Sequence, residues 1–270
     1  MNDHRQSNEP DGNAASAPQV ATQFDVVAPL YDELMTGVPY DKWIGYLQKL
    51  LALSNLTPRR ILDLACGTGN VSELLAEEGY HSIVGVDIAP AMIAEARAKA
   101  SQRSLNIDYR VQDAAELDIP GPPFDLCISL FDSLNYVLQP ERLQMAFHRV
   151  AAHLSRNGLF IFDLNTEYAL INGFFTQDNQ GTPAALQYRW QSTFDRGARI
   201  CTVNMSFEHR PLGGPQRSFK EVHQQFAYRK DEILDMLDLA GFSKVDVYQA
   251  YTLRPSSRTS DRLFYVAVKP

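Results

Sequence analysis

The chain has 270 residues, of which 45% are hydrophobic and 21% are charged. This composition is typical of a globular protein, so wholesale disorder is excluded. The net charge of −7 argues against a protein that binds nucleic acid through a global positive field. Three widely spaced cysteines are too few for a disulfide framework or a zinc cluster, and they fit a reducing, cytoplasmic setting.

The chain begins with a polar stretch and continues into helical patterns. Residues 1–22 are rich in Asn, Ser, Ala, Gln, Gly and Pro, which predicts a disordered tail. The N-terminus lacks the apolar core of a signal peptide, and no apolar run approaches the ~20 residues that a transmembrane helix needs. Aromatic and apolar residues at helical spacing over 24–53 predict two helices, separated at Pro39.

Apolar strands and helical segments alternate over the next hundred residues. The predicted strands are 59–64, 81–86, 107–112, 124–130 and 159–164, and the predicted helices are 71–78, 90–99 and 140–154. A helix over 231–240 and strands at 244–251 and 263–268 follow later. This alternation predicts an α/β fold with a Rossmann-like, mostly parallel seven-stranded sheet covered by helices on both faces.

Residues 166–229 interrupt this rhythm. Extended stretches at 185–193, 199–209 and 218–227 are separated by turn signals, which predicts an antiparallel β insert of about three strands. We therefore expect a core made of residues 23–165 and 230–270, with 166–229 inserted as a lid.

A glycine-rich loop, Ala65-Cys66-Gly67-Thr68-Gly69-Asn70, follows the first predicted strand. It places backbone N–H groups and a helix N-terminus at the carboxyl edge of the sheet, where α/β proteins bind ligands. A dinucleotide fingerprint needs a third glycine, but that position falls on Ser72 or Asn70, depending on the register. A P-loop is excluded because no Gly-Lys-Ser/Thr follows.

The run Leu62-Asp63-Leu64-Ala65-Cys66-Gly67-Thr68-Gly69 closely resembles motif I of class I S-adenosylmethionine-dependent methyltransferases. That motif has an acidic residue, here Asp63, followed by small residues at alternate positions that end in Gly67 and Gly69. Ala65 stands where many members have a first glycine. The resemblance covers 60–165 well and the order of the last strands extends it to 270. It implies S-adenosylmethionine as the cofactor and methyl transfer as the activity.

Three later segments carry the same resemblance, each at the end of a predicted strand. In the run 85–92, Asp87 is implied to bind both ribose hydroxyls, although an NAD site uses an acid in the same way. The other implied cofactor contacts are Ile88 and Met92 around the adenine, Asp113 with its neighbours Gln112 and Ala114 at the adenine amino group, and Leu130 and Phe131 beside Asp132 and Ser133.

The N-terminal helices resemble a branch that includes sugar-amine N-methyltransferases and the glycine N-methyltransferase group. In that branch an aromatic residue closes over the cofactor, and Tyr31, then Tyr40 and Trp43, are the candidates here. The alternative is that these aromatic residues are amphipathic core contacts.

The acceptor is constrained only weakly. Amino-methyltransferases of nucleobases or glutamine carry a Pro-Pro-aromatic motif after strand four, whereas Pro122-Pro123-Phe124 lies before that strand. We therefore expect transfer to N or O of a small molecule, and a nucleic-acid acceptor is disfavoured. An RNA or protein methyltransferase, a non-catalytic cofactor-binding protein and a nicotinamide enzyme are the alternatives.

Candidate catalytic residues are Tyr31, Asp132 and His223. Together with Glu221, His223 is placed to bind or deprotonate an acceptor, or else is a solvated or structural polar residue of the lid. Arg254, Arg258 and Arg262 are expected to form an exposed basic loop, and the alternative is that they meet an acidic acceptor. No metal site is expected, because His148 and His153 are poorly spaced for metal ligands.

Overall fold

The computed structural model describes residues 23, 24, 26–179 and 185–270, so the tail predicted over 1–22 lies outside the described residues. Its main sheet has seven strands in the order β10-β11-β5-β4-β1-β2-β3. β11 runs antiparallel to both of its neighbours, and the other pairs are parallel. This confirms the predicted fold class. The strands are β1 (Arg60–Leu64), β2 (Ser82–Asp87), β3 (Asp108–Val111), β4 (Phe124–Ser129), β5 (Leu154–Asn165), β10 (Lys244–Gln249) and β11 (Arg262–Val268).

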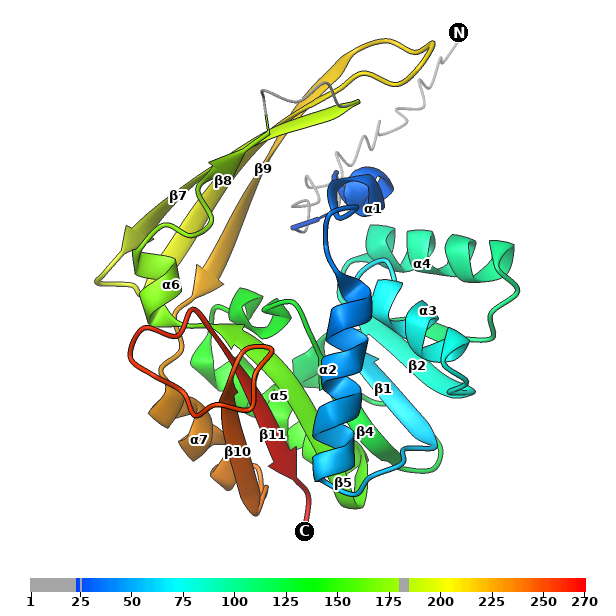
Figure 1. Cartoon of the computed structure of the whole chain (residues 1–270), viewed down its shortest axis with the longest axis vertical. Helices are drawn as coiled ribbons and strands as arrows, with labels where there is room; N and C mark the ends of the chain where they lie inside the picture. Colours follow the sequence, from blue (N-terminus) through cyan, green and yellow to red (C-terminus); the bar gives the residue numbers. More distant parts are fainter. Residues whose placement is uncertain (1–22, 25, 180–184) are drawn as a thin grey trace, which may run out of the picture.

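Helices cover both faces of this sheet (Figure 1). α2 (Tyr40–Leu53) and α3 (Asn70–Glu77) pack on one face, and α5 (Pro140–His153) and α7 (Lys230–Leu239) pack on the other. α4 (Pro90–Gln102) packs on Tyr109 of β3. In α5, Leu143, Phe147 and Val150 recur at helical spacing and are fully buried, which explains why this segment docks on the sheet.

β5 differs from its prediction. The predicted strand is 159–164, but β5 begins at Leu154 and contains Asn157-Gly158 as a bulge. Phe124 pairs with Leu154, whereas Leu126 already pairs with Leu159. Asn157 adopts a left-handed backbone with φ of 61°. Because Leu154 is buried against the core, the chain continues as a strand through these residues instead of ending.

A second, antiparallel sheet lies between α6 (Glu167–Ile171) and α7 and rises above the carboxyl ends of the main strands (Figure 1). It has four strands: β6 (Gln177–Asp178), β7 (Leu186–Asp195), β8 (Ile200–His209) and β9 (Arg217–Phe226). The prediction of about three strands missed β6, because two residues leave no period in the sequence. In β8, Cys201, Val203, Met205 and Phe207 alternate as buried residues and form the inner face of this sheet.

The N-terminal segment faces this inner side. It comprises Phe24, the 3-10 turn η1 (Ala28–Leu30) and the short helix α1 (Tyr31–Leu34). Ala28 packs against Ala89 and Met92 at the start of α4, and Val27 packs into the cluster under β8. The segment therefore bridges the main sheet and the second sheet. Over the described ranges, none of the helices has the length and apolar character needed to cross a bilayer.

Candidate active site

The glycine loop between β1 and α3 is shaped by left-handed backbone at Ala65, Gly67 and Gly69, with φ of 58°, 56° and 82°. A Cβ atom on Gly69 would lie 2.1 Å from the Tyr109 hydroxyl oxygen, so only glycine fits there. The same left-handed geometry explains why many proteins with motif I have glycine where this chain has Ala65. The loop is fixed to β2 by a hydrogen bond from the Cys66 amide to the Val86 carbonyl at 3.0 Å.

Asp87 ends β2 and holds this loop from the other side. Its Oδ2 accepts the Gly67 amide at 2.8 Å, and its Oδ1 accepts the Ala89 amide at 2.9 Å. Burial raises the pKa of the carboxyl, and the two amide donors oppose that rise. Each carboxylate oxygen keeps a lone pair for a further donor. Asp87 is therefore a preorganised acceptor at the edge of the sheet.

A cavity of about 680 Å³ lies between the glycine loop, the N-terminal segment and the second sheet. The main sheet, the loops after its strands and α4 contribute Asp63, Ala65, Gly67, Asp87, Ile88, Met92, Leu130, Phe131, Asp132 and Tyr136 to its wall. The N-terminal part contributes Phe24, Val27, Tyr31 and Tyr40, and the second sheet contributes Trp190, Val203, Met205, Phe207 and His223. Most of the candidate residues from distant parts of the sequence thus meet in one space.

Other sequence candidates lie outside this wall. Trp43 stacks on Phe131 with ring centroids 3.8 Å apart and belongs to the core under α2. It therefore packs against Phe131, which lines the cavity, without lining the cavity itself. The Gln112 side chain is bonded to the backbone of Asp118. Asp113 accepts the Ala115 amide at 2.8 Å and pairs with Arg142, and Ala114 packs against the core. Their role as cofactor contacts stays a prediction.

Two aromatic candidates of the N-terminal part do reach the cavity. Burial raises the pKa of the Tyr31 hydroxyl well above its ordinary value, so it is a neutral group. Burial also raises the pKa of Tyr40 to about 12, and its hydroxyl accepts a hydrogen bond from Asn70 at 3.1 Å. Asp32 of α1 accepts Thr68 Oγ1 at 2.6 Å and pairs with Lys99 at 2.7 Å, which anchors this segment to the glycine loop.

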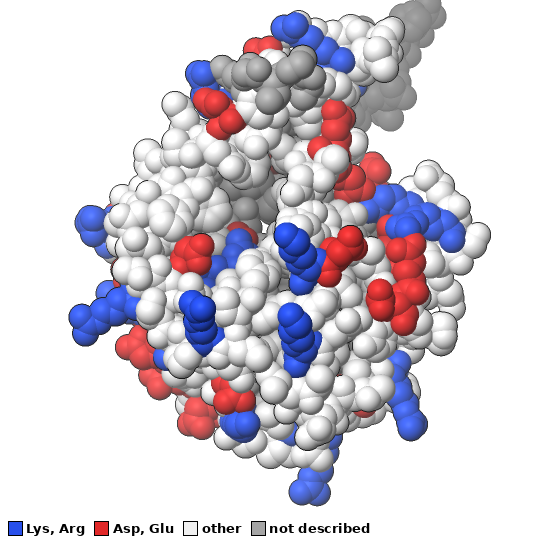
Figure 2. Space-filling view, in the orientation of Figure 1, with Lys and Arg blue, Asp and Glu red and all other residues white. Residues whose placement is uncertain are grey.

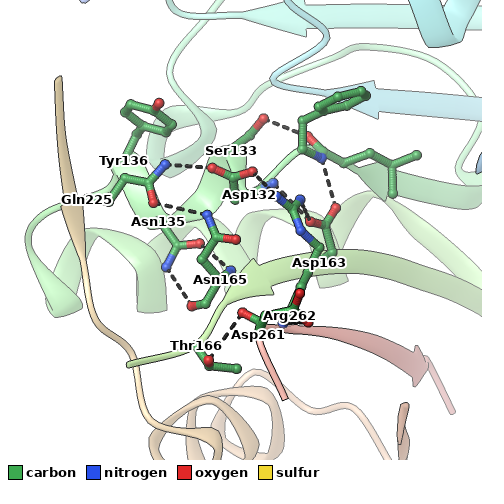
Figure 3. Close-up of polar contacts among 12 residues, drawn as sticks. Asp132, Ser133, Asn135, Tyr136, Asp163, Asn165, Thr166, Gln225, Asp261 and Arg262 are labelled. Carbon is green, nitrogen blue, oxygen red and sulfur yellow. Dashed lines mark hydrogen bonds and ion pairs between the residues drawn. The ribbon is translucent and has the colours of Figure 1, made fainter. Parts of the chain in front are cut away.

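A buried ionic network lies beneath the loop that follows β4 (Figure 3). The Arg262 guanidinium contacts Asp132 at 2.6 Å and also pairs with Asp163 of β5. Asp163 accepts the amides of Phe131 and Asp132 at 2.8 and 3.0 Å. Gln225 of β9 donates to Asp132 at 2.5 Å, which connects the second sheet to the same network.

The prediction of an exposed basic loop is therefore wrong for Arg262, although Arg254 and Arg258 are exposed. Arg262 is the first residue of β11, which pairs with β5, and its side chain is only 18% exposed. Two acids at the ends of adjacent strands, Asp132 and Asp163, need a buried counter-charge. That requirement is the sequence signal that would have identified Arg262.

His223 is also buried, so the solvated alternative is wrong, whereas a structural role and a role in binding or deprotonating the acceptor both stay predictions. It is 1% exposed, and its Nε2 lies 2.7 Å from Glu221 Oε2. Its Nδ1 lies 3.5 Å from the Tyr136 hydroxyl oxygen. Trp190 provides another polar group at the wall, because its Nε1 is buried and has no hydrogen-bond partner among the described residues.

Comparison with known proteins agrees with this geometry. Residues 61–158 match a family described as a methyltransferase domain. A protein of Geobacillus sp. (strain WCH70) that is named as a methyltransferase is 32% identical over 248 residues, which are 91% of this chain and 99% of the relative.

Solved structures share the fold. An S-adenosylmethionine-dependent methyltransferase from Clostridium acetobutylicum has a TM-score of 0.79 and 29% identity, and the match covers 91% of this chain and 98% of that one. The sugar N-methyltransferase KedS8 from Streptoalloteichus sp. has a TM-score of 0.72 at 19% identity and covers 99% of both chains.

The chain belongs to the class I S-adenosylmethionine-dependent methyltransferases. It is an enzyme of methyl transfer, and its cofactor is S-adenosylmethionine.

Replacement of Arg262 by alanine leaves Asp132 and Asp163 buried without a counter-charge. We expect R262A to lower the free energy of unfolding by about 3–5 kcal/mol. Urea denaturation measures this, and R258A is the matched control in the loop just before β11, with an expected change within about 0.5 kcal/mol. A loss below about 1 kcal/mol for R262A would show that the network contributes little.

Asp63 makes stability depend on pH. Its side chain is buried, it accepts Ser72 Oγ at 2.6 Å, and burial raises its pKa to about 7. Since an unfolded Asp titrates near about 4, the folded state holds the proton more tightly. This contribution to the free energy of unfolding is complete below about pH 4 and is lost as the pH rises through about 7.

The variant D63N keeps an oxygen for Ser72 and cannot ionise. We expect its stability relative to wild type to increase by roughly 2–4 kcal/mol between pH 4 and pH 8. Urea unfolding of both proteins across this range measures the difference. A difference that does not vary with pH would contradict the assignment.

Proposed function

We propose that this enzyme transfers the methyl group to N or O of a small-molecule acceptor, held between the carboxyl edge of the main sheet and the second sheet acting as a lid. The observation that carries this proposal is the cavity of about 680 Å³, which has the size typical of small-molecule sites. Its outer wall is aromatic and apolar, with a few polar groups. A sugar N-methyltransferase with the same fold supports an acceptor of this size.

The residues present fit the cofactor. Beside the cavity, Gly67 permits close approach of a ligand to the loop, and both Asp87 oxygens have capacity for ribose hydroxyls. Ile88 and Met92 supply apolar contact for adenine, and Tyr31 covers the space between them and the second sheet. When bound, S-adenosylmethionine supplies a methyl group on a positively charged sulfur.

The chain's own contribution is positioning and proton removal. His223 is the base that finally holds the proton lost by the acceptor, because it is the imidazole at the cavity wall. Asp132 orients the acceptor, and its charge is held in place by Arg262 and Gln225. Tyr31 excludes water from the reacting atoms. A preactivated methyl donor needs little more than correct orientation in a dry site.

Trp190 narrows the acceptor class. It lines the cavity together with Met205 and Phe207, and its indole N–H is buried without a hydrogen-bond partner among the described residues. A buried donor without a partner costs free energy, which a ligand oxygen would remove. The acceptor we propose has an apolar or ring-shaped body, an oxygen that accepts from Trp190, and an amine or hydroxyl near His223.

The charge distribution supports a small molecule over RNA or a protein. On the face in Figure 2, Lys and Arg side chains are interspersed with Asp and Glu instead of forming one continuous basic surface. An RNA-binding groove would gather positive charge there.

The function is tested by calorimetric titration with S-adenosylmethionine, S-adenosylhomocysteine and NADH, followed by transfer of labelled methyl to a panel of small amines and phenols and to total RNA. We expect binding of the first two ligands and label on a small molecule. Label on RNA alone would overturn the proposed acceptor, and transfer to no acceptor would favour a non-catalytic binding protein.

Asp87 has its own test. In D87A two charge-assisted hydrogen bonds to the ribose are lost, so we expect cofactor affinity to fall by about 2–4 kcal/mol. D108A is the matched control, because Asp108 is exposed at the start of the neighbouring strand β3. Calorimetry measures both, and an unchanged affinity in D87A would remove Asp87 from the site.

A further inference from the structure

We propose that Glu221 is a positioning residue that holds His223 ready to accept a proton at Nδ1, and that it does so only while the N-terminal segment is docked. This inference rests on the proposed function, because it assigns how the proposed base is prepared. The observation behind it is that the Glu221 carboxylate binds the N-terminal segment with one oxygen and the His223 imidazole with the other.

The carboxylate of Glu221 joins parts of the chain that are far apart in sequence. Its Oε1 accepts the amide of Val26 at 3.0 Å and the amide of Val27 at 2.8 Å, across sequence separations of 195 and 194 residues. Its Oε2 accepts from His223 Nε2 at 2.7 Å. The side chain is 8% exposed, so these three donors replace the water that the carboxylate would otherwise bind.

The hydrogen bond to Glu221 determines the tautomer of His223. A carboxylate only accepts hydrogen bonds, so Nε2 of a neutral imidazole must carry the hydrogen. The lone pair is then on Nδ1, which faces the Tyr136 hydroxyl at 3.5 Å. Burial raises the pKa of Tyr136, so its hydroxyl is protonated and donates toward Nδ1. Both side chains line the cavity.

The docked segment also covers the imidazole. The Phe24 ring lies 4.3 Å from the His223 ring and 5.1 Å from the Tyr136 ring, measured between centroids. Phe24, Val26 and Val27 therefore act together, since the ring excludes water and the amides hold the carboxylate. When this segment leaves, Glu221 and His223 are exposed to water and the imidazole loses its fixed tautomer.

The proton path balances as follows. The acceptor's N–H or O–H gives its proton to the Tyr136 oxygen, and Tyr136 gives its own hydroxyl proton to His223 Nδ1. The acceptor's lone pair forms the new bond to the methyl group, and the electron pair of the broken methyl–sulfur bond stays on sulfur. The resulting imidazolium is compensated by the Glu221 carboxylate, which is the reason for placing an acid at Nε2.

The sharpest test is E221Q. Two backbone amides favour the glutamine carbonyl oxygen, so the side-chain NH₂ group faces His223 Nε2. That nitrogen must then accept, which moves the imidazole hydrogen to Nδ1 and removes the proposed proton acceptor. The N-terminal segment stays docked, so its role and the role of the tautomer are separated.

Three kinds of measurement compare E221Q with the wild-type enzyme. Nitrogen-15 NMR, with His223 assigned by H223N, should show Nε2–H in wild type and Nδ1–H in E221Q. Hydrogen exchange of Val26 and Val27 and the affinity for S-adenosylhomocysteine should change by less than about threefold. With the acceptor found in the screen, kcat should fall by about 100-fold at unchanged KM. E208Q, an exposed acid on β8, should match wild type in every readout.

A second variant tests the coupling without altering Glu221. Val27 has φ of −82°, which is close to the range of proline, so V27P removes one amide donor. We expect the Val26 amide to exchange about tenfold faster and His223 to show a mixture of tautomers. This variant also serves if E221Q does not fold.

The inference is overturned if wild-type His223 carries its hydrogen on Nδ1, if E221Q keeps the wild-type tautomer, or if V27P leaves the tautomer unchanged. These results are independent of the acceptor. Failure of methyl transfer in wild type would therefore count against the proposed function, whereas a wrong tautomer would count against the role of Glu221.

Discussion

The geometry of the cavity floor depends on one guanidinium. Arg262 begins β11 and neutralises Asp132, in the loop after β4, and Asp163 of β5. Phe131 and Asp132 have left-handed backbones with φ of 67° and 50°, which L-residues adopt at a cost. Their amides donate to Asp163, and this offsets the strain. A buried ionic cluster of this kind specifies one arrangement of the loop more than it adds stability.

The walls of the site come from parts of the chain that cannot form them alone. The glycine loop and Asp87 belong to the first half of the main sheet, and Arg262 belongs to its last strand. Between them, the second sheet provides Gln225, which reaches Asp132. The N-terminal segment is held by Asp32 on one side and by Glu221 on the other. The site is therefore a property of the whole fold.

Local patterns predicted the main sheet well. The strands of the main sheet are apolar because both faces of the sheet are covered, so their apolar runs are visible in the sequence. Asp87 could be identified because it is the residue on which β2 ends. The bulge around Asn157, the two-residue β6 and the burial of Arg262 and His223 depend on partners distant in sequence. Glu221, the partner of His223, is only two residues away in the sequence. His223 is nevertheless covered by Phe24 and Tyr136, which are distant in the sequence. Trp43 likewise shows helical spacing, which does not reveal that Phe131 covers it.

The bond between Val26 and Glu221 spans 195 residues, and this has a consequence for biosynthesis. At about 5–20 residues per second, a ribosome needs roughly 10–40 s to make Glu221 after Val26 has been added. Until then the N-terminal aromatic residues have no second sheet to cover. The N-terminal segment is thus translated before the second sheet but is among the last parts to dock, and a nascent chain holding a complete glycine loop still has an open site.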